Sequence, residues 1–303
     1  MASPSLGLRA ECHAGHATAY LLTMRIGYQG EPLSYSHRAV TELFPDGEAV
    51  GVESFAGAFA ALDAGIVDRL VLPVENSTTG SVLPVLDRLP GDAAHDPIAI
   101  VAEHLVEVRH ALLGIAGARL EDLVQVRSHP EALAQAEGAL LALGIEAVPM
   151  HDTAGAVREV AERRDPTVGA LAPPAAGEAF GLVVLERDVL DRDHNTTRFV
   201  VLAPGEPRVD PDDDKTTLVF TTSHTPGALA LVLTELGLRG ANLTRIESRP
   251  ATEAWSYRFF VDLVHVPGPA GLAAVIDPPP ATCAELKVLG SYRGVPRSAG
   301  LPR

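Results

Sequence analysis

The sequence predicts an α/β protein of two domains, and three observations lead to this fold class. The chain has 303 residues, which is more than a single hydrophobic core usually holds. From residue 25 to about residue 203, short apolar runs alternate with helical patterns, as they do in α/β sheet proteins. After a polar linker over 204–214, the remaining elements follow the order β-α-β-β-α-β, which is typical of a ferredoxin-like domain over 215–292.

The first half of the large domain opens with a strand over 25–28 that ends at Gln29-Gly30. Ser36 and Ser54 can each cap a helix, because a serine hydroxyl accepts a hydrogen bond from an N–H group of the first turn. The unbroken apolar run over 70–74 predicts a buried strand. The helices expected here are 36–43, 54–64 and 82–89, and extended segments are expected over 98–108 and 111–115.

The second half of the large domain repeats this alternation. Pro130 favours the first turn of a helix over 128–143, because its fixed φ suits the helix and its missing N–H would have no partner there. Asp152 can cap a helix that reaches residue 163. A short helix is expected over 173–180, and the expected strands are 124–127, 145–148, 168–171 and 197–202.

The small domain has one unusual element, its second helix. Pro278, Pro279 and Pro280 cannot stand inside a helix, because proline lacks an N–H group and its ring clashes with the preceding turn. We therefore expect this helix to be short or broken. The other elements expected are strand 216–221, helix 226–236, and strands 243–248, 255–264 and 286–289. Outside the domains, residues 1–23 are expected to be a disordered extension or a start-codon artefact, and 293–303 a tail.

Composition argues against several classes of protein. Lys and Arg number 24 against 39 Asp and Glu, and the resulting net charge of −15 argues against a nucleic-acid partner, whose phosphates need cationic contacts. Two cysteines build neither a disulfide framework nor a thiolate zinc site. No apolar run approaches the roughly 20 residues of a membrane span, and no secretory signal pattern is visible. We expect a cytoplasmic protein with neither a metal nor a membrane partner.

Polar residues gather at four places where a predicted strand ends, which is where open α/β sheets bind their ligands. The four clusters are residues 29–36, 73–82, 128–135 and 194–201. Each cluster alone also has an ordinary structural explanation. Ser and Thr before a helix commonly act as caps, and Thr197 suits a strand because it is β-branched.

Taken together, these clusters resemble the catalytic domain of the prephenate dehydratase family, in a form also similar to plant arogenate dehydratases. The motifs that carry the resemblance are GYQGEPLSYSHRA (27–39), PVENSTTGSV (73–82), SHPEALAQ (128–135) and NTTRF (195–199). Downstream, residues 224–250, 255–263 and 286–292 resemble an ACT regulatory domain. The resemblance covers residues 25–292. One departure is Glu31-Pro32-Leu33, which stands where many members have Gly-Thr-Phe.

The resemblance implies a bilobal, periplasmic-binding-protein-like catalytic domain over 25–203. One lobe would comprise 25–100 and 190–203, and the other 104–185. In the cleft between the lobes, prephenate would lose water and CO2 and give phenylpyruvate for L-phenylalanine biosynthesis, without a cofactor. Thr197 would protonate the leaving hydroxyl or donate a hydrogen bond to it. The implied substrate-binding residues are Asn76, Ser77, Ser128, Gln135, Thr196 and Arg198. Arg198 could pair either with a substrate carboxylate or with an acid of the protein itself.

The ACT resemblance implies that phenylalanine binds between two such domains of a homo-oligomer and inhibits the enzyme. The implied effector-binding residues are Gly227, Ala228, Leu229, Asn242, Glu247, Ser248, Arg249 and Pro250. Two alternatives stay open. One is an arogenate dehydratase that forms phenylalanine directly, and the other is a non-catalytic small-anion binding protein with a sensory ACT domain.

Overall fold

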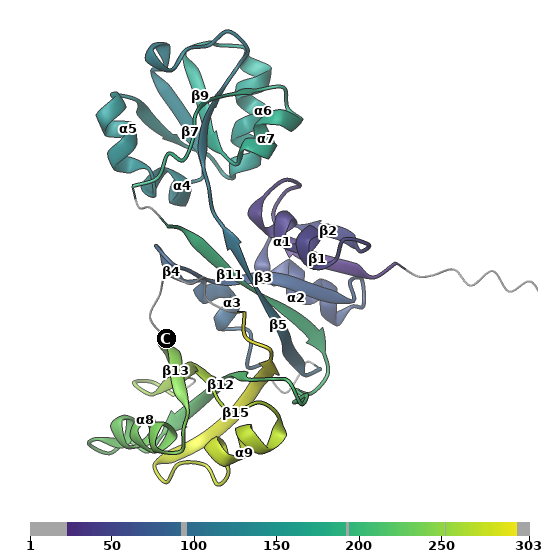
Figure 1. Cartoon of the computed structure of the whole chain (residues 1–303), viewed down its shortest axis with the longest axis vertical. Helices are drawn as coiled ribbons and strands as arrows, with labels where there is room; N and C mark the ends of the chain where they lie inside the picture. The colour runs from purple at the N-terminus through teal and green to yellow at the C-terminus, as the bar shows by residue number, and fades with distance from the viewer. Residues whose placement is uncertain (1–22, 92–95, 192–193, 252, 296–303) are drawn as a thin grey trace, which may run out of the picture.

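The computed structural model describes residues 23–91, 96–191, 194–251 and 253–295 as three bodies stacked along the long axis of the molecule (Figure 1). We call them the second lobe, at the top of the view, the first lobe, in the middle, and the C-terminal domain, at the bottom. Residues 1–22 and 296–303 lie outside the described part of the chain, so the expectations for the extension and most of the tail fall there.

The first lobe is built on a mixed sheet whose strand order is β2-β1-β3-β11-β5, with β4 paired to β3. Strands β1, β2 and β3 are parallel, and β11 runs antiparallel to both β3 and β5. The strands are β1 Arg25–Gln29, β2 Glu48–Val52, β3 Arg69–Asn76, β4 Gly80–Ser81, β5 Ile98–Glu107 and β11 Thr196–Pro204. The helices are α1 Tyr35–Leu43, α2 Phe55–Asp63 and α3 Leu83–Leu86.

The second lobe has a five-stranded sheet in the order β10-β6-β9-β7-β8. The chain enters this lobe after β5 and returns to the first lobe through β11, so two segments connect the lobes (Figure 1). The strands are β6 Ala111–Gly114, β7 Gln125–Ser128, β8 Glu146–Pro149, β9 Val168–Ala172 and β10 Val183–Glu186. The helices are α4 Pro130–Ala134, α5 Glu137–Leu143, α6 Thr153–Arg163 and α7 Pro174–Ala179, with a 3₁₀ turn at Leu120–Asp122.

The C-terminal domain confirms the expected ferredoxin-like fold, with an antiparallel sheet in the order β13-β14-β12-β15. Its elements are β12 Lys215–Thr222, α8 Ala228–Leu238, β13 Asn242–Pro250, β14 Tyr257–Val264, α9 Pro269–Ile276 and β15 Cys283–Tyr292. The expectation of a short second helix is also confirmed, because α9 ends at Ile276, just before the three prolines.

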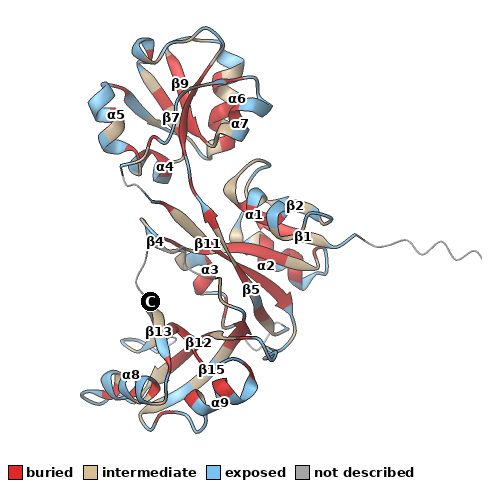
Figure 2. Ribbon diagram, viewed as in Figure 1, coloured by how far each residue is buried: buried red, intermediate tan, exposed pale blue. Residues whose placement is uncertain are grey.

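The C-terminal domain shares a hydrophobic core with the first lobe. Phe260 and Leu289 of this domain join Val200 and Leu202 of β11 in one buried cluster. Figure 2 shows this continuity as buried residues along β3, β5 and β11. Because side chains alternate along a strand, Phe199 and Val201 point to the other face of β11, where they pack in a second hydrophobic cluster with residues of α1. The strand β11 is therefore packed on both faces.

Several boundaries differ from the sequence-based expectations by a few residues, and two of the differences have a clear cause. The cap of α1 is Ser34, whose Oγ accepts from His37 N, and Ser36 lies inside the helix. The helix expected over 128–143 is broken at Gln135 and Ala136. A second helix begins there because the carboxylate of Asp191, distant in sequence, accepts hydrogen bonds from the N–H groups of the first turn of α5.

The division into lobes also needs a correction. Strand β5 stays paired with β11 through Glu107, so the first lobe extends past residue 100 and includes residues 104–107, which we had expected in the second lobe. Three short strands, β2, β4 and β10, were not expected. Each has at most five residues and is at least partly exposed, so it carries a weak apolar pattern.

Candidate functional site

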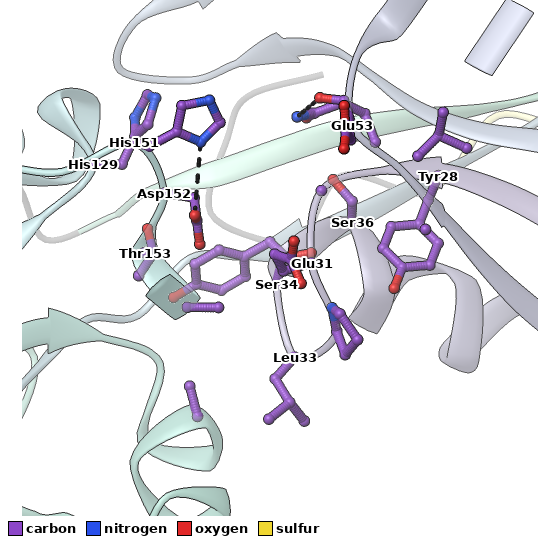
Figure 3. A pocket seen from close by; sticks show the side chains of 18 of the residues that line it. Tyr28, Glu31, Leu33, Ser34, Ser36, Glu53, His129, His151, Asp152 and Thr153 are labelled. Atoms are coloured by element: carbon purple, nitrogen blue, oxygen red, sulfur yellow. Dashed lines mark hydrogen bonds and ion pairs between the residues drawn. The ribbon is translucent and has the colours of Figure 1, made fainter. Parts of the chain in front are cut away.

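Two adjoining cavities lie in the cleft between the lobes. The smaller one, of about 600 Å³, is lined by Asn76, Gln135 and Thr197 together with residues of α1, α4 and the segment that connects the lobes. The second one, of about 950 Å³, shares Gln29, Tyr35 and several other residues with it. Figure 3 shows this second cavity, with Ser34 and Ser36 of the first lobe facing Asp152 and Thr153 of the second lobe.

Thr197 stands at the start of β11, where the register with β3 pairs it with Asn76. The side-chain amide Nδ2 of Asn76 donates to Thr197 Oγ1 at 2.9 Å. Asn76 is held in this orientation because its Oδ1 accepts from the backbone N–H groups of Thr78 and Thr79 and from the Thr78 hydroxyl. Since the Thr197 oxygen is already an acceptor, its own proton is available to donate into the cleft.

Asn195 links this pair to the second lobe. The second hydrogen of Asn76 Nδ2 goes to Asn195 Oδ1 at 2.7 Å, and Asn195 Nδ2 donates to Gln135 Oε1 at 2.7 Å. We call Thr197, Asn76, Asn195 and Gln135 the amide chain. It consists of neutral groups, crosses from one lobe to the other, and brings together the threonine, asparagine and glutamine that the sequence placed far apart.

His110 lies beside the amide chain and was not expected in the site. It lines the smaller cavity, yet only 4% of its surface is exposed. Burial lowers the pKa of His110 to about 4, although a hydrogen bond to Gln135 acts in the opposite direction. Its imidazole is therefore neutral at pH 7. Its Nδ1 lies 3.5 Å from the hydroxyl of Tyr35, which also bonds the backbone of Arg109.

The charged lining of the cleft is acidic. Glu31, Glu53, Glu131 and Asp152 line one or both cavities, and no Lys or Arg occurs among the described residues that line them. The first turns of α1 and α6, one from each lobe, begin at this cleft. One N–H group of each turn donates to its cap, Ser34 or the Asp152 carboxylate, and the others have no acceptor within the helix. The cleft thus combines N–H and hydroxyl donors with an acidic rim.

Arg198 does not lie where substrate binding would require. It follows Thr197 on β11, so its side chain leaves the opposite face of the strand. The guanidinium is buried and bonds Glu103 of β5 and Asp262 of β14. Of the two roles that the sequence left open, this geometry corresponds to pairing with an acid of the protein and corrects the assignment to the substrate.

Three other expected substrate-binding residues support the strands and do not line the cavities. Ser128 is fully buried, and its hydroxyl donates to Leu171 O at 2.6 Å, which ties β7 to β9. Ser77 Oγ accepts from Thr196 N at 3.0 Å, and Ser77 N donates to Thr196 O, so the two residues join the end of β3 to β11. His110 lines one of the cavities instead, and Asn195, which lines neither, forms hydrogen bonds with Asn76 and Gln135, which do.

The expected effector-binding residues fall into two groups. Gly227, Ala228 and Leu229 line a cavity of about 1060 Å³ at the start of α8. The residues on β13 lie elsewhere: Glu247 accepts from Ser81 Oγ of the first lobe, and Arg249 forms two hydrogen bonds with Asp87. The remaining residues of this group, all exposed on β13, are Asn242, Ser248 and Pro250.

Two further properties concern the whole of the described chain. Among the residues that the structure describes, no group of three His, Cys, Asp or Glu side chains is arranged to hold a metal ion. None of the helices in this described part combines the length and the apolar character that crossing a membrane requires.

Comparison with known proteins gives consistent matches. The family model of prephenate dehydratase matches residues 26–207. Arogenate dehydratase 2 of Petunia hybrida is 42% identical over 75% of this chain, which spans only 57% of that relative. Arogenate dehydratase/prephenate dehydratase 2 of Arabidopsis thaliana is 37% identical over 89% of this chain and 72% of its own length.

Solved structures agree with these matches. A prephenate dehydratase from Arthrobacter aurescens, in complex with L-Phe, has 28% identity and a TM-score of 0.75, covering 89% of this chain and 90% of its own. A quorum-quenching acylase, GqqA, has 34% identity and a TM-score of 0.77, covering 90% of this chain and 98% of its own. The family match, the relatives and the shared fold together show that this chain belongs to the prephenate dehydratase family.

Proposed function

We propose that this protein is a carbon–oxygen lyase that converts prephenate to phenylpyruvate, CO2 and water. The observation that carries the proposal is the amide chain, which brings the Thr197 hydroxyl into the inter-lobe cleft with its proton available to donate. The ring carboxylate leaves as CO2, and the electron pair of that C–C bond enters the ring. The ring hydroxyl leaves with the pair of the C–O bond and becomes water on protonation, and the ring becomes aromatic.

The protein has two tasks in this reaction, to hold the substrate and to stabilise the departing hydroxide. Thr197 performs the second task by donating a hydrogen bond to the leaving oxygen, where negative charge develops. Asn76 fixes the direction of that hydroxyl, Asn195 accepts a hydrogen bond from Asn76, and Gln135 of the other lobe accepts one from Asn195. His110, whose imidazole is neutral at pH 7, adds no charge beside this arrangement. The first turns of α1 and α6 supply N–H donors for the substrate carboxylates.

A second candidate substrate is arogenate, which has an ammonium group where prephenate has a keto group. Glu31, Glu53 and Glu131 around the cavities favour it, because carboxylates attract an ammonium and repel the second negative charge of a dianion. The reaction would then form phenylalanine directly. The two substrates are separated by comparing kcat/KM for each with the same enzyme preparation.

We further propose that phenylalanine regulates the enzyme through the C-terminal domain of a homo-oligomer. The support is the cavity at Gly227, Ala228 and Leu229, together with the L-Phe complex of the Arthrobacter relative. The β13 residues expected to complete the site do not line this cavity within one chain. A second copy of the domain could supply them.

The decisive test compares Thr197→Val with Thr197→Ser. Valine has the shape of threonine without the hydroxyl, so kcat should fall by about two to four orders of magnitude. Serine keeps the hydroxyl, so we expect kcat within about tenfold of wild type. Product formation from prephenate and from arogenate is measured, and circular dichroism checks the fold. Equal turnover of Thr197→Val and wild type would refute the role of Thr197, and a wild-type protein that turns over neither substrate would refute the proposed function.

A further inference from the structure

Strand β11 carries the catalytic centre on one face and the contact with the C-terminal domain on the other. Thr197 and Phe199 line the cleft, whereas Arg198 between them points to the opposite side. The C-terminal domain therefore contacts the residue next to Thr197, although no residue of that domain lines the cleft cavities. The contact of Arg198 with the C-terminal domain thus bears on the position of the Thr197 side chain.

Arg198 forms hydrogen bonds with three groups, two of which belong to the C-terminal domain, and its Nη1 also lies 3.9 Å from a carboxylate oxygen of Glu75 on β3. Its Nε donates to Glu103 Oε2 at 2.6 Å, and this residue is part of the first lobe. Its Nη1 donates to the carboxylate of Asp262 on β14, and its Nη2 donates to the Tyr292 hydroxyl on β15 at 2.7 Å. All three partners are at most 6% exposed. Each of these three guanidinium N–H groups therefore donates to a buried acceptor.

The cluster is balanced in charge and fixed by further contacts. Lys215 donates to Glu103 at 2.6 Å, and Arg245 lies 3.7 Å from the Glu75 carboxylate that also faces Arg198, so three cations face three carboxylates. Thr217 Oγ1 bonds both Asp262 and the Tyr292 hydroxyl, which locks the two groups of the C-terminal domain against each other. Although burial opposes ionisation, the neighbouring Arg198 keeps the pKa of Asp262 below its usual range. Removing one charge would leave the others uncompensated in a buried site.

The backbone of β11 is irregular on one side at the position where the cluster acts. The ladder between β11 and β3 shifts register between Arg198 and Phe199, where Val74 has no partner on β11, whereas the ladder with β5 stays regular from Thr196 to Val201. A register shift interrupts the regular hydrogen bonds and lets the strand bend. On the β3 side, where Asn76 lies, the direction of Thr197 therefore depends on contacts besides the ladder, and Arg198 is the adjacent anchored side chain.

We propose that Asp262 and Tyr292 of the C-terminal domain are positioning residues for the dehydratase reaction, which hold Arg198 and through it the Thr197 hydroxyl against Asn76. The inference rests on the proposed function. It means that the catalytic centre reaches its working geometry only with the C-terminal domain docked. It also gives that domain a direct mechanical connection to the reacting hydroxyl.

The test uses Asp262→Asn and Tyr292→Phe, with Asp87→Asn as the matched control. Asp87 also accepts two hydrogen bonds across the same domain boundary, from Arg249, but it follows the end of α3 and does not line the cleft cavities. We expect kcat to fall about tenfold or more in Asp262→Asn and less in Tyr292→Phe, since small displacements of a catalytic group have large effects. KM should change little, and Asp87→Asn should keep the wild-type kcat.

Two measurements separate positioning from general stability. The double variant Arg198→Met/Asp262→Asn removes both charges, so its thermal stability should recover relative to Asp262→Asn while kcat stays low. Hydrogen exchange followed by mass spectrometry should show faster exchange around Thr197 in Asp262→Asn and Tyr292→Phe than in Asp87→Asn. This second readout does not depend on turnover, so it tests the inference even if the wild type converts neither substrate.

Three outcomes would overturn the inference. The first is a wild-type kcat in the double variant or in Tyr292→Phe. The second is an equal loss of kcat in Asp87→Asn, which would indicate a general effect of domain docking. The third is unchanged exchange around Thr197 in both cluster variants. If the wild type is active and any of these results is found, the proposed function stands and only the positioning role of Asp262 and Tyr292 is refuted.

Discussion

The contact between β15 and β5 can be tested by adding a single methyl group, with Gly290→Ala. Gly290 faces the backbone of Ile100, and a Cβ built there would lie 2.1 Å from the Ile100 carbonyl oxygen and 2.6 Å from its Cβ. These atoms belong to the paired strand β5, which cannot turn away as a flexible side chain can. The methyl group must therefore push the C-terminal domain from the first lobe.

The expected cost follows from this geometry. Ordinary van der Waals contact begins near 3.4 Å, so the two strands must separate by roughly 1 Å, and overpacking of this kind costs about 1–3 kcal/mol. We expect the upper part of that range because backbone atoms of a sheet have to move. Since β5 pairs with β11 along the stretch that includes Thr197, kcat should fall as well.

The assay is denaturant unfolding followed by circular dichroism, combined with steady-state kinetics on the folded protein. Gly237→Ala serves as the control, because Gly237 is in α8 and a Cβ there meets no atom within 4 Å. That change should stabilise the protein by about 0.5–1 kcal/mol, since alanine favours a helix more than glycine. If Gly290→Ala is as stable and as active as wild type, the close docking of β15 on β5 is wrong.

Two further predictions concern the buried histidine and the proposed effector cavity. His110 has a pKa of about 4 in the folded protein and 6.5 as a free side chain. As the pH falls, its imidazole is therefore protonated in the unfolded protein before it is protonated in the folded protein. The stability it contributes is complete above pH 6.5 and falls by up to about 3 kcal/mol as the pH decreases to 4. Unfolding measured across this window should show a weaker pH dependence for His110→Gln than for wild type, and parallel curves would contradict the burial argument. Gly227 adopts a φ of +80°, where a β-branched residue is strained, so Gly227→Val should abolish phenylalanine inhibition and leave kcat near the wild-type value. Inhibition assays that give the same response for both proteins would place the effector elsewhere.

Local patterns were sufficient for most of the elements, and the family resemblance supplied the hydroxyl that we propose to react. Alternating apolar residues and caps predicted the strands and helices, and the proline triplet predicted where α9 ends. Patterns of this kind act over a few residues, so they are visible in the sequence. The break between α4 and α5 was not visible, because the cap of α5 comes from Asp191, more than 50 positions along the chain.

The sequence by itself determined the order of the elements, the ferredoxin-like arrangement of the C-terminal domain and the motifs that mark the family. It also determined that Thr197 and Arg198, as neighbours on a strand, must face opposite ways. Only the tertiary structure decided what each of them meets. Arg198 meets Asp262, 64 positions away, and Asn195 joins Gln135 across 60 positions. Alternation along a strand fixes the side to which a residue points, but the partner on that side depends on how the lobes and the C-terminal domain pack.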